Sequence, residues 1–191
     1  MIPLPNTSLL DAFIMKSLSI FCGSRLGKNP LYAKEAKVVA KALSESNINL
    51  VYGGANVGLM AILADELLAL GGKVIGVMPK SLIDRERAHQ GLTQLHTVDT
   101  MHERKALMHE LSDGAILMPG GSGSLDEFFE VFTWAQLGYH TKPVAILNTN
   151  NYFSHLIQFI EHGVSSGFIS KNEQSKILVK DCPFALIHSM K

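Results

Sequence analysis

The stretch GAILMPGGSGSLDEFFEVFTWAQLG, residues 114–138, contains a strand pattern, a glycine-rich loop and a helix pattern in direct succession. Residues 114–121 form a short apolar run that predicts a buried strand stopped by glycines, and residues 124–138 have helical periodicity that ends at Gly138. The glycines let the backbone approach a ligand closely, and the start of the following helix offers free N–H groups to an anion. From the residues alone, the loop has two interpretations, a phosphate site and a tight turn.

The same alternation of strand and helix patterns extends along the rest of the chain. Short apolar runs predict strands at 17–22, 48–54, 73–79, 142–148 and 175–181, and an alternating pattern at 93–99 predicts a strand near an edge of the sheet. Helical periodicity predicts helices at 29–46, 58–72, 100–112 and 152–164. Apolar strands that alternate with helices are typical of a parallel sheet covered on both faces. With right-handed crossovers, the expected fold is a single-domain α/β protein with a doubly wound, Rossmann-like parallel sheet flanked by helices.

The composition fits one globular domain with balanced charge. Of 191 residues, 47% are hydrophobic and 18% are charged, which is typical of a folded chain with a sizeable core. We expect one domain over residues 15–191, with an N-terminal extension at 1–14. The 17 basic residues equal the 17 acidic ones, and this balance argues against a general nucleic-acid or anionic-membrane binder.

Several patterns favour a cytoplasmic protein without a metal or cofactor. No apolar run reaches the roughly 20 residues that span a bilayer, and the first residues lack the basic segment and cleavage site of a secretory signal. Cys22 and Cys182 form no CxxC pair and are expected to be free thiols in a reducing compartment. The zinc motif HExxH is absent, because His102 and His109 are seven positions apart.

In an open α/β sheet, ligands lie outside the carboxyl ends of the strands. Four loops are predicted at that edge, at 22–30, 52–58, 78–86 and 118–127. They supply Ser24, Gly54 and Gly120 as candidate ligand-binding residues. GSRLGKN is not a P-loop, because only three residues separate its glycines and Asn29 follows the lysine. Neither GGANVG nor GGSGS is the GxGxxG fingerprint, so a dehydrogenase is disfavoured.

Two acids follow the loop at 118–127 directly. Asp126 and Glu127 are expected in the first turn of the helix, where they would complement the helix dipole by about 0.3–1 kcal/mol. That interpretation does not explain why an acid follows an anion-binding loop. The alternative is that an acid faces a different part of the ligand, such as a sugar or leaving group.

Two further charged segments each have two interpretations. The helix that begins near MHERK, at 101–105, is capped by Thr100 or Asp99 and presents either a solvated face or positive charge for the same ligand. The charged stretch at 80–91 is either a solvated loop or a lid and pocket wall.

Taken together, these segments resemble a known family. PGGSGSLDE is similar to the PGGxGTxxE signature of the LOG family, the cytokinin riboside 5'-monophosphate phosphoribohydrolases, many of whose relatives were long labelled lysine decarboxylases. FCGS, YGGANVGLM, GVMPKSL, MHERK and FTWAQLGYHTKPVAILN resemble the family's other blocks in the same order. The resemblance covers residues 17–170 or so and implies hydrolysis of the N-glycosidic bond of a purine nucleoside 5'-monophosphate.

The resemblance also implies roles for individual residues. Arg104 and Glu127 take the catalytic positions. The implied nucleotide-binding positions are Glu86, Lys105, Gly121, Ser122, Gly123, Ser124, Leu125, Asp126 and Thr133. The implied partners are a purine nucleoside monophosphate, such as AMP or a cytokinin ribotide, and a second copy of the chain, in a homodimer with its active sites near the interface.

The implied chemistry agrees with the residues present. Cleavage of a ribosyl bond builds an oxocarbenium-like sugar, which the Glu127 carboxylate would stabilise while it orients or deprotonates water. Arg104 stays protonated and cannot act as a base, so it would hold phosphate or ribose hydroxyls. The alternatives are a non-catalytic nucleotide or cofactor carrier, and a decarboxylase, which would need pyridoxal phosphate on a lysine.

The sequence departs from the family pattern at four positions. Ser124 replaces the usual threonine but keeps its hydroxyl, so phosphate binding is expected to survive. Arg25 stands where a second serine is common, and Ala55 and Ala61 stand where glycines are common. These changes bear on substrate fit more than on catalysis.

Overall fold

The computed structural model describes residues 15–83 and 87–191, so the extension predicted at 1–14 lies outside the described residues. Within these ranges, seven strands form one sheet in which every neighbouring pair is parallel. The strands are β1 Ser17–Phe21, β2 Asn49–Tyr52, β3 Val74–Pro79, β4 Gln94–Val98, β5 Ala115–Leu117, β6 Val144–Leu147 and β7 Ile177–Lys180. The predicted parallel α/β fold is therefore confirmed.

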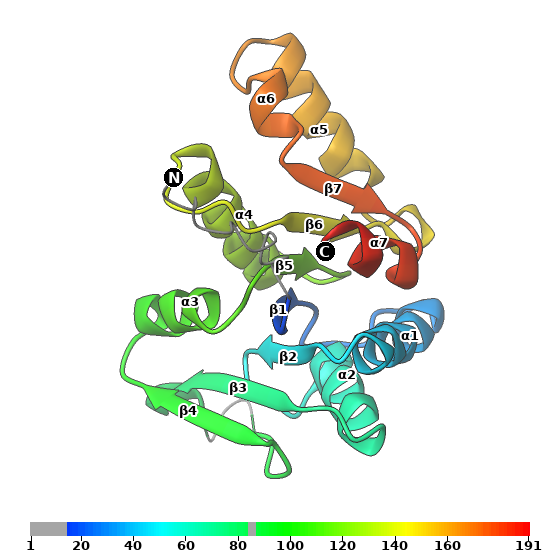
Figure 1. Ribbon diagram of the computed structural model, residues 1–191, viewed down its shortest axis with the longest axis vertical. Coiled ribbons are helices and arrows are strands. Elements are labelled where there is room, and N and C mark those ends of the chain that lie inside the picture. Colours follow the sequence, from blue (N-terminus) through cyan, green and yellow to red (C-terminus); the bar gives the residue numbers. More distant parts are fainter. Residues whose placement is uncertain (1–14, 84–86) are drawn as a thin grey trace, which may run out of the picture.

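The order of strands across the sheet is β4-β3-β2-β1-β5-β6-β7. The chain builds outward from β1 to β4, returns to place β5 on the other side of β1, and then builds outward to β7. Figure 1 shows this arrangement, with β4 at one edge of the sheet and β7 at the other. The direction of winding reverses between β1 and β5, which is where a doubly wound sheet forms its ligand-binding crevice.

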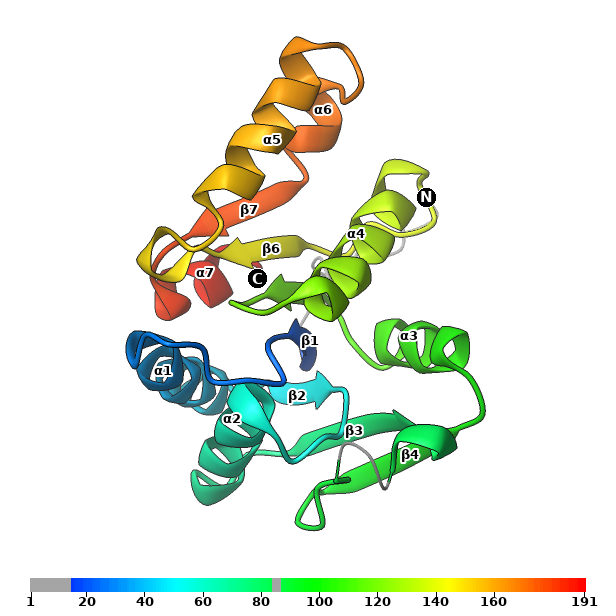
Figure 2. The same cartoon turned by 180° about the vertical axis from the view of Figure 1, so that it is seen from behind.

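Helices cover both faces of the sheet. They are α1 Leu31–Glu45, α2 Gly58–Ala69, α3 Met101–Glu110, α4 Ser122–Gln136, α5 Ser154–Ser165, α6 Lys171–Gln174 and α7 Pro183–Ser189. In Figures 1 and 2, α1 and α2 lie on one side of the strands, and α3 and α4 lie on the other. Two short 3₁₀ helices, η1 Lys80–Leu82 and η2 Thr149–Asn151, follow β3 and β6.

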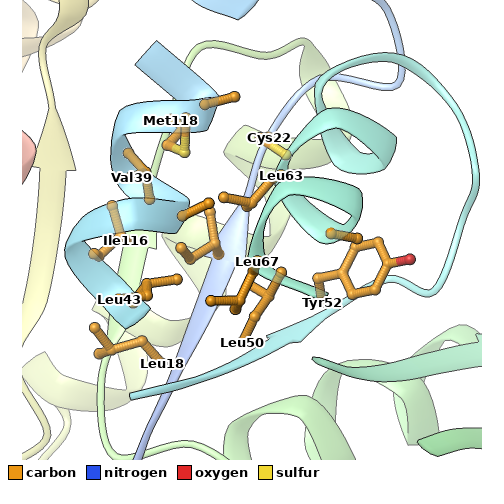
Figure 3. Close-up of a cluster of buried hydrophobic side chains, with 14 of the residues drawn as sticks. Leu18, Cys22, Val39, Leu43, Leu50, Tyr52, Leu63, Leu67, Ile116 and Met118 are labelled. Atoms are coloured by element: carbon orange, nitrogen blue, oxygen red, sulfur yellow. The ribbon is translucent and has the colours of Figure 1, made fainter. Parts of the chain in front are cut away.

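The strands divide their side chains between two apolar clusters, because successive side chains point to opposite faces. Along β1, Leu18 and Ile20 join a cluster with α1, α2 and α7, whereas Phe21 joins a second cluster with α3, α4 and α5. Figure 3 shows the first cluster, in which strand residues such as Leu50 pack against Leu43 of α1 and the leucines of α2. Burial on both faces explains why the strands are continuous apolar runs.

The sequence prediction and the structure differ in three places. The strand predicted at 114–121 covers only Ala115–Leu117, and the helix predicted from residue 124 already begins at Ser122. The helices α6 and α7 are not predicted, because four and seven residues are too few to show a full apolar repeat. The strand expected near an edge is β4, which is confirmed as an edge strand.

Candidate active site

A pocket of about 600 Å³ lies at the carboxyl ends of β1 and β5. Its walls come from the loops after these two strands, from the first turns of α2, α3 and α4, and from one residue each of α1 and the segment before α5. The pocket is thus at the point where the sheet reverses its winding. The predicted site residues that line it are Ser24, Arg104, Gly120, Gly121, Ser122, Gly123, Ser124, Asp126 and Glu127.

Backbone contacts through Gly23 join the two loops that form the pocket. The Gly23 N–H donates to the Pro119 carbonyl at 3.0 Å, and the Leu59 N–H at the start of α2 donates to the Gly23 carbonyl at 3.0 Å. Gly58 has a φ of +58°, and a side chain there would collide with the backbone between Ser24 and Arg25. These contacts fix the loops after β1, β2 and β5 relative to one another.

The glycine-rich loop leads directly into α4 and is not a tight turn. Gly121 is the extended N-cap, without a capping side chain, and the Leu125 N–H makes a bond of 3.2 Å back to the Gly121 carbonyl. The N–H groups at 122–124 precede that bond and have no acceptor within the helix, so they are available to an anion. Their position on the pocket wall favours the phosphate interpretation.

Gly121 and Gly123 are not glycines for reasons of folding. Neither has a positive φ, and a Cβ added to either would meet no described residue within 4 Å. Glycine inside a helix costs about 0.5–1 kcal/mol relative to alanine, so Gly123 is unfavourable for α4, whereas Gly121 at the N-cap carries no such cost. Both line the pocket, and the space that they leave open lets a ligand approach the backbone.

The expectation that Asp126 and Glu127 lie in the first helical turn is wrong. The α4 helix begins at Ser122 and has no acid in its first turn, so both acids fall in the second turn. Weak helix formers at 122 and 123 obscured the start, although such residues are tolerated where the first N–H groups lack acceptors anyway. Because the dipole effect falls off within one turn, it does not account for these acids.

Arg104 is the buried cation of the pocket. Its side chain is only 7% exposed, and its Nη2 lies 3.9 Å from Oε1 of Glu127, whose side chain is 14% exposed. The Nη1 donates to the Met101 sulfur at 3.7 Å, and the Nε has no hydrogen-bond partner among the described residues. At 3.9 Å, Arg104 and Glu127 attract each other without a direct hydrogen bond between these two atoms.

Lys105, the next residue on α3, turns away from the pocket. Its Nζ lies 3.2 Å from Oδ2 of Asp126 and 3.1 Å from Oε1 of Glu130, and its side chain is 12% exposed. Burial favours the neutral amine, but the hydrogen bonds to Glu130 and Asp126 outweigh this effect and raise the pKa of Lys105. Within the described part of the chain, Lys105 therefore ties α3 to α4.

Cys22 lies on the pocket wall at the end of β1. Burial, together with the negative charge of Glu127, raises the pKa of the Cys22 thiol. The thiol is therefore protonated at neutral pH and is a poor nucleophile. Cys22 and Cys182 are both free, as predicted.

The remaining predicted residues are not brought to this pocket. Gly54 has a φ of +79° and its carbonyl accepts a hydrogen bond from the His89 N–H at 2.9 Å. Leu125 packs against the second apolar cluster, and Thr133 is exposed on α4. Glu86 lies outside the described residues, and the described residues of 80–91 do not line the pocket.

Sequence reasoning missed three contributors to the site. Tyr32 and Tyr152 line the pocket with their rings edge-to-face at 5.5 Å between centroids, and no local motif links these distant positions. Gly53, rather than Gly54, is the glycine beside Arg104: a side chain at Gly53 would collide with the guanidinium. The two glycines of YGG indicate a close approach of the backbone, but the sequence does not show which of the two lies against Arg104.

The described residues contain neither a metal-binding cluster nor a membrane-spanning helix. Among residues 15–83 and 87–191, no group of three or more His, Cys, Asp or Glu side chains is placed to hold a metal ion. In the same part of the chain, no helix has the length and apolar character needed to cross a membrane.

The fold and pocket define the class of protein: a Rossmann-like α/β protein whose switch-point crevice holds a helix start with free N–H groups and a buried arginine–glutamate pair. Residues 60–190 match the model of the family described as "Possible lysine decarboxylase". The chain is 48% identical over 165 residues to the cytokinin riboside 5'-monophosphate phosphoribohydrolase of Rhodococcoides fascians, covering 86% of this chain and 83% of that protein. A protein of the same name from Arabidopsis thaliana is 44% identical over 161 residues, covering 84% and 75%.

The chain belongs to this family, also known as the LOG family. Solved structures agree on the fold: the molybdenum cofactor binding protein of Rippkaea orientalis superposes with a TM-score of 0.68 and 19% identity, covering 91% of this chain and 96% of that one. At that identity the likeness establishes the fold alone.

Proposed function

We propose that this protein hydrolyses the N-glycosidic bond of purine nucleoside 5'-monophosphates, cytokinin ribotides or AMP among them, and releases the free base and ribose 5-phosphate. The observation that carries the proposal is the arrangement of Arg104 and Glu127 on the same pocket wall as the open start of α4. The names of the relatives at 41–48% identity support the same reaction. The family description as a decarboxylase has less support, because no lysine is among the described residues that line the pocket.

The phosphate is assigned to the start of α4. The N–H groups of Ser122, Gly123 and Ser124 supply donors, and the helix dipole adds a partial positive charge at the same place. Binding energy from the phosphate is remote from the reacting bond, so it can hold the ribose in position for attack. This assignment also accounts for the glycines at 121 and 123, which the fold does not require.

Glu127 is proposed as the catalytic carboxylate. Breaking the ribosyl bond leaves positive charge on the sugar, and a carboxylate beside the ribose stabilises that charge and orients or deprotonates the attacking water. Water adds its oxygen to the ribose carbon, and the base leaves with the bonding electron pair. One proton of the water stays on the new ribose hydroxyl, and the other ends on the released base. Arg104 holds ribose or phosphate oxygens and attracts the Glu127 carboxylate across 3.9 Å.

The proposal includes a homodimer and a cytoplasmic location. Thr133 and Lys105 lie outside the pocket of the single chain, so a nucleotide-binding role for them needs a larger site than one copy provides. Leu137 and Tyr139, just beyond α4, are 62% and 76% exposed and offer apolar surface for a second copy. Size-exclusion chromatography with light scattering tests the dimer, and a purely monomeric protein with full activity would rule it out.

Free Cys22 and Cys182 are compatible with the proposed cytoplasmic location, because the cytoplasm is a reducing compartment.

The reaction is tested by incubating the protein with AMP and with isopentenyl-AMP, and by following the free base and ribose 5-phosphate by chromatography. We expect Glu127→Gln to lower turnover by about 10²- to 10⁴-fold while leaving nucleotide binding nearly intact. The matched control is Glu110→Gln, the same change at an exposed position near the end of α3. A protein that binds ribotides without releasing base would instead be a carrier, and unchanged turnover of Glu127→Gln would refute the catalytic assignment.

A further inference from the structure

Tyr152 is held in place by an unusual stretch of backbone between β6 and α5. Asn150 and Asn151 both have positive φ angles, of 51° and 59°, a conformation that costs free energy for residues other than glycine and that asparagine tolerates best. The Asn148 side chain accepts the Phe153 N–H at 2.8 Å, and the Tyr152 N–H donates to the Thr149 carbonyl at 3.1 Å. This strained turn delivers the Tyr152 side chain to the pocket, where its ring meets Tyr32.

The hydroxyl of Tyr152 bonds to the backbone of the glycine-rich loop. It donates to the Gly120 carbonyl oxygen at 2.6 Å, which is a short and well-formed hydrogen bond. Gly120 is also packed closely on its other sides, since a Cβ there would collide with the Ser124 hydroxyl and lie 2.9 Å from the Gly23 nitrogen. The carbonyl of Gly120 therefore has a fixed direction.

That direction controls the next N–H group. In a trans peptide, the carbonyl of one residue and the N–H of the next point in opposite directions. With its carbonyl toward Tyr152, the Gly120–Gly121 peptide points the Gly121 N–H away from Tyr152. Glycines at both ends tolerate the backbone dihedral angles of either peptide orientation, and a flip would exchange the positions of the N–H donor and the carbonyl oxygen. A carbonyl oxygen at the start of α4 would repel an anion.

We propose that Tyr152 is a positioning residue for the anion-binding loop: its hydroxyl fixes the Gly120–Gly121 peptide in the orientation that presents N–H donors to the 5'-phosphate. The strained turn and the donated hydrogen bond are independent observations that meet at this side chain. The inference rests on the proposed nucleotide site, which it deepens by adding a determinant of phosphate affinity from outside the family's sequence motifs.

The test compares Tyr152→Phe with Ser165→Ala, which also removes a hydroxyl that donates to a backbone carbonyl, but at an exposed position of α5 outside the pocket. Binding of ribose 5-phosphate and of adenosine is measured by calorimetry, and turnover of AMP by chromatography. For Tyr152→Phe we expect affinity for ribose 5-phosphate to fall about tenfold, the value of one hydrogen bond, with adenosine binding unchanged. KM should rise more than kcat falls, and Ser165→Ala should match the wild type.

Amide NMR provides a second readout that a purely structural role would not change. In the wild type, the Gly121 amide signal should be single and should shift when inorganic phosphate is added. In Tyr152→Phe it should broaden or split as the peptide exchanges between two orientations. Unchanged phosphate affinity with a single Gly121 signal would overturn the inference, as would an equal loss of affinity for ribose 5-phosphate and adenosine, which would make Tyr152 a pocket wall. If no base is released but Tyr152→Phe still weakens ribose 5-phosphate binding, the proposed reaction fails and this inference stands.

Discussion

The loops after β2 and β5 are both rich in glycine, but their glycines have different causes. After β2, Gly53 lies against Arg104, and Gly54 and Gly58 have positive φ angles and close neighbours. After β5, Gly121 and Gly123 have ordinary φ angles, and no described residue occupies the space where a side chain would be. The first set is required by the fold, whereas the fold does not require the second set, which faces the pocket.

This difference gives a physical criterion for separating structural from ligand-binding glycines. Where an added side chain would collide with the protein's own backbone, the fold itself requires glycine. A glycine that nothing in the described chain requires, at a helix start where alanine would be more stable, indicates that something outside the chain occupies the space. The criterion predicts that substitutions after β2 disturb the protein's own contacts and that substitutions after β5 weaken ligand binding, so mutagenesis can test it.

The largest effect is expected for Gly58→Ala. The new side chain would meet the backbone of the loop after β1 while holding a φ of +58°, so we expect a loss of about 2–4 kcal/mol in the free energy of unfolding. Urea denaturation measures it. The control is Gly71→Ala, which has a φ of +79° but no neighbour within 4 Å and should lose only the smaller conformational part. Equal losses in the two variants would show that the contact between loops contributes nothing.

A second substitution, Gly53→Ala, should affect catalysis more than folding. Its side chain would displace the Arg104 guanidinium, and we expect kcat to fall about 100-fold, as for the loss of one charge-stabilising donor. Steady-state kinetics on a ribotide substrate test this. Combining it with Arg104→Gln should add little to the effect of Arg104→Gln alone, because both act through one side chain. Full additivity would mean that Gly53 acts elsewhere.

In contrast, Gly123→Ala should preserve stability and weaken ligand binding. We expect the melting temperature to stay within a degree or so of the wild type or to rise, and affinity for ribose 5-phosphate to fall about tenfold as the methyl group occupies ligand space. Thermal melts and calorimetry measure the two quantities on the same samples. A large drop in melting temperature with intact affinity would place Gly123 among the structural glycines.

The smallest expected effect is on the loss of folding stability at acidic pH, which we expect to depend on a residue outside both loops. At the far end of α3, burial and then the charges of Lys142 and His140 lower the pKa of His109 to about 4 from its usual 6.5. Between these values the unfolded chain binds the proton and the folded protein does not, so stability falls as pH drops from about 6.5 to about 4. His109→Phe should show a smaller fall in melting temperature over that range. A curve parallel to the wild type would exclude His109 as a source of acid sensitivity.

Much of the architecture was readable because local patterns and global fold agree. Continuous apolar runs such as those around Leu50 and Ile116 are what a strand buried on both faces requires, so strand existence was clear. Strand order across the sheet was not, because residues far apart in sequence decide it. The helix starts were also uncertain: glycine and serine at 122–123 look like loop, yet they form the first turn of α4.

The candidate site shows the same division. MHERK and the glycine-rich loop were both identified, but the spacing could not separate Arg104 from Lys105. Only the packing of α3 against α4 sends Arg104 toward Glu127 and Lys105 toward Asp126 and Glu130. Neighbouring side chains on a helix point about 100° apart, so the choice depends on how the helix is rotated against its partners.

The sequence by itself determined the fold class, the family and a glycine-rich helix start suited to an anion, because these depend on periodicity, glycine placement and short motifs within one segment. The tertiary structure decided which residues meet. It placed Glu127 beside Arg104, assigned the close glycine to Gly53, and brought Tyr152 to the Gly120 carbonyl. The physical reason is that burial, ion pairing and steric contact are properties of neighbours in space, and the sheet's crossovers create those neighbours from distant parts of the chain.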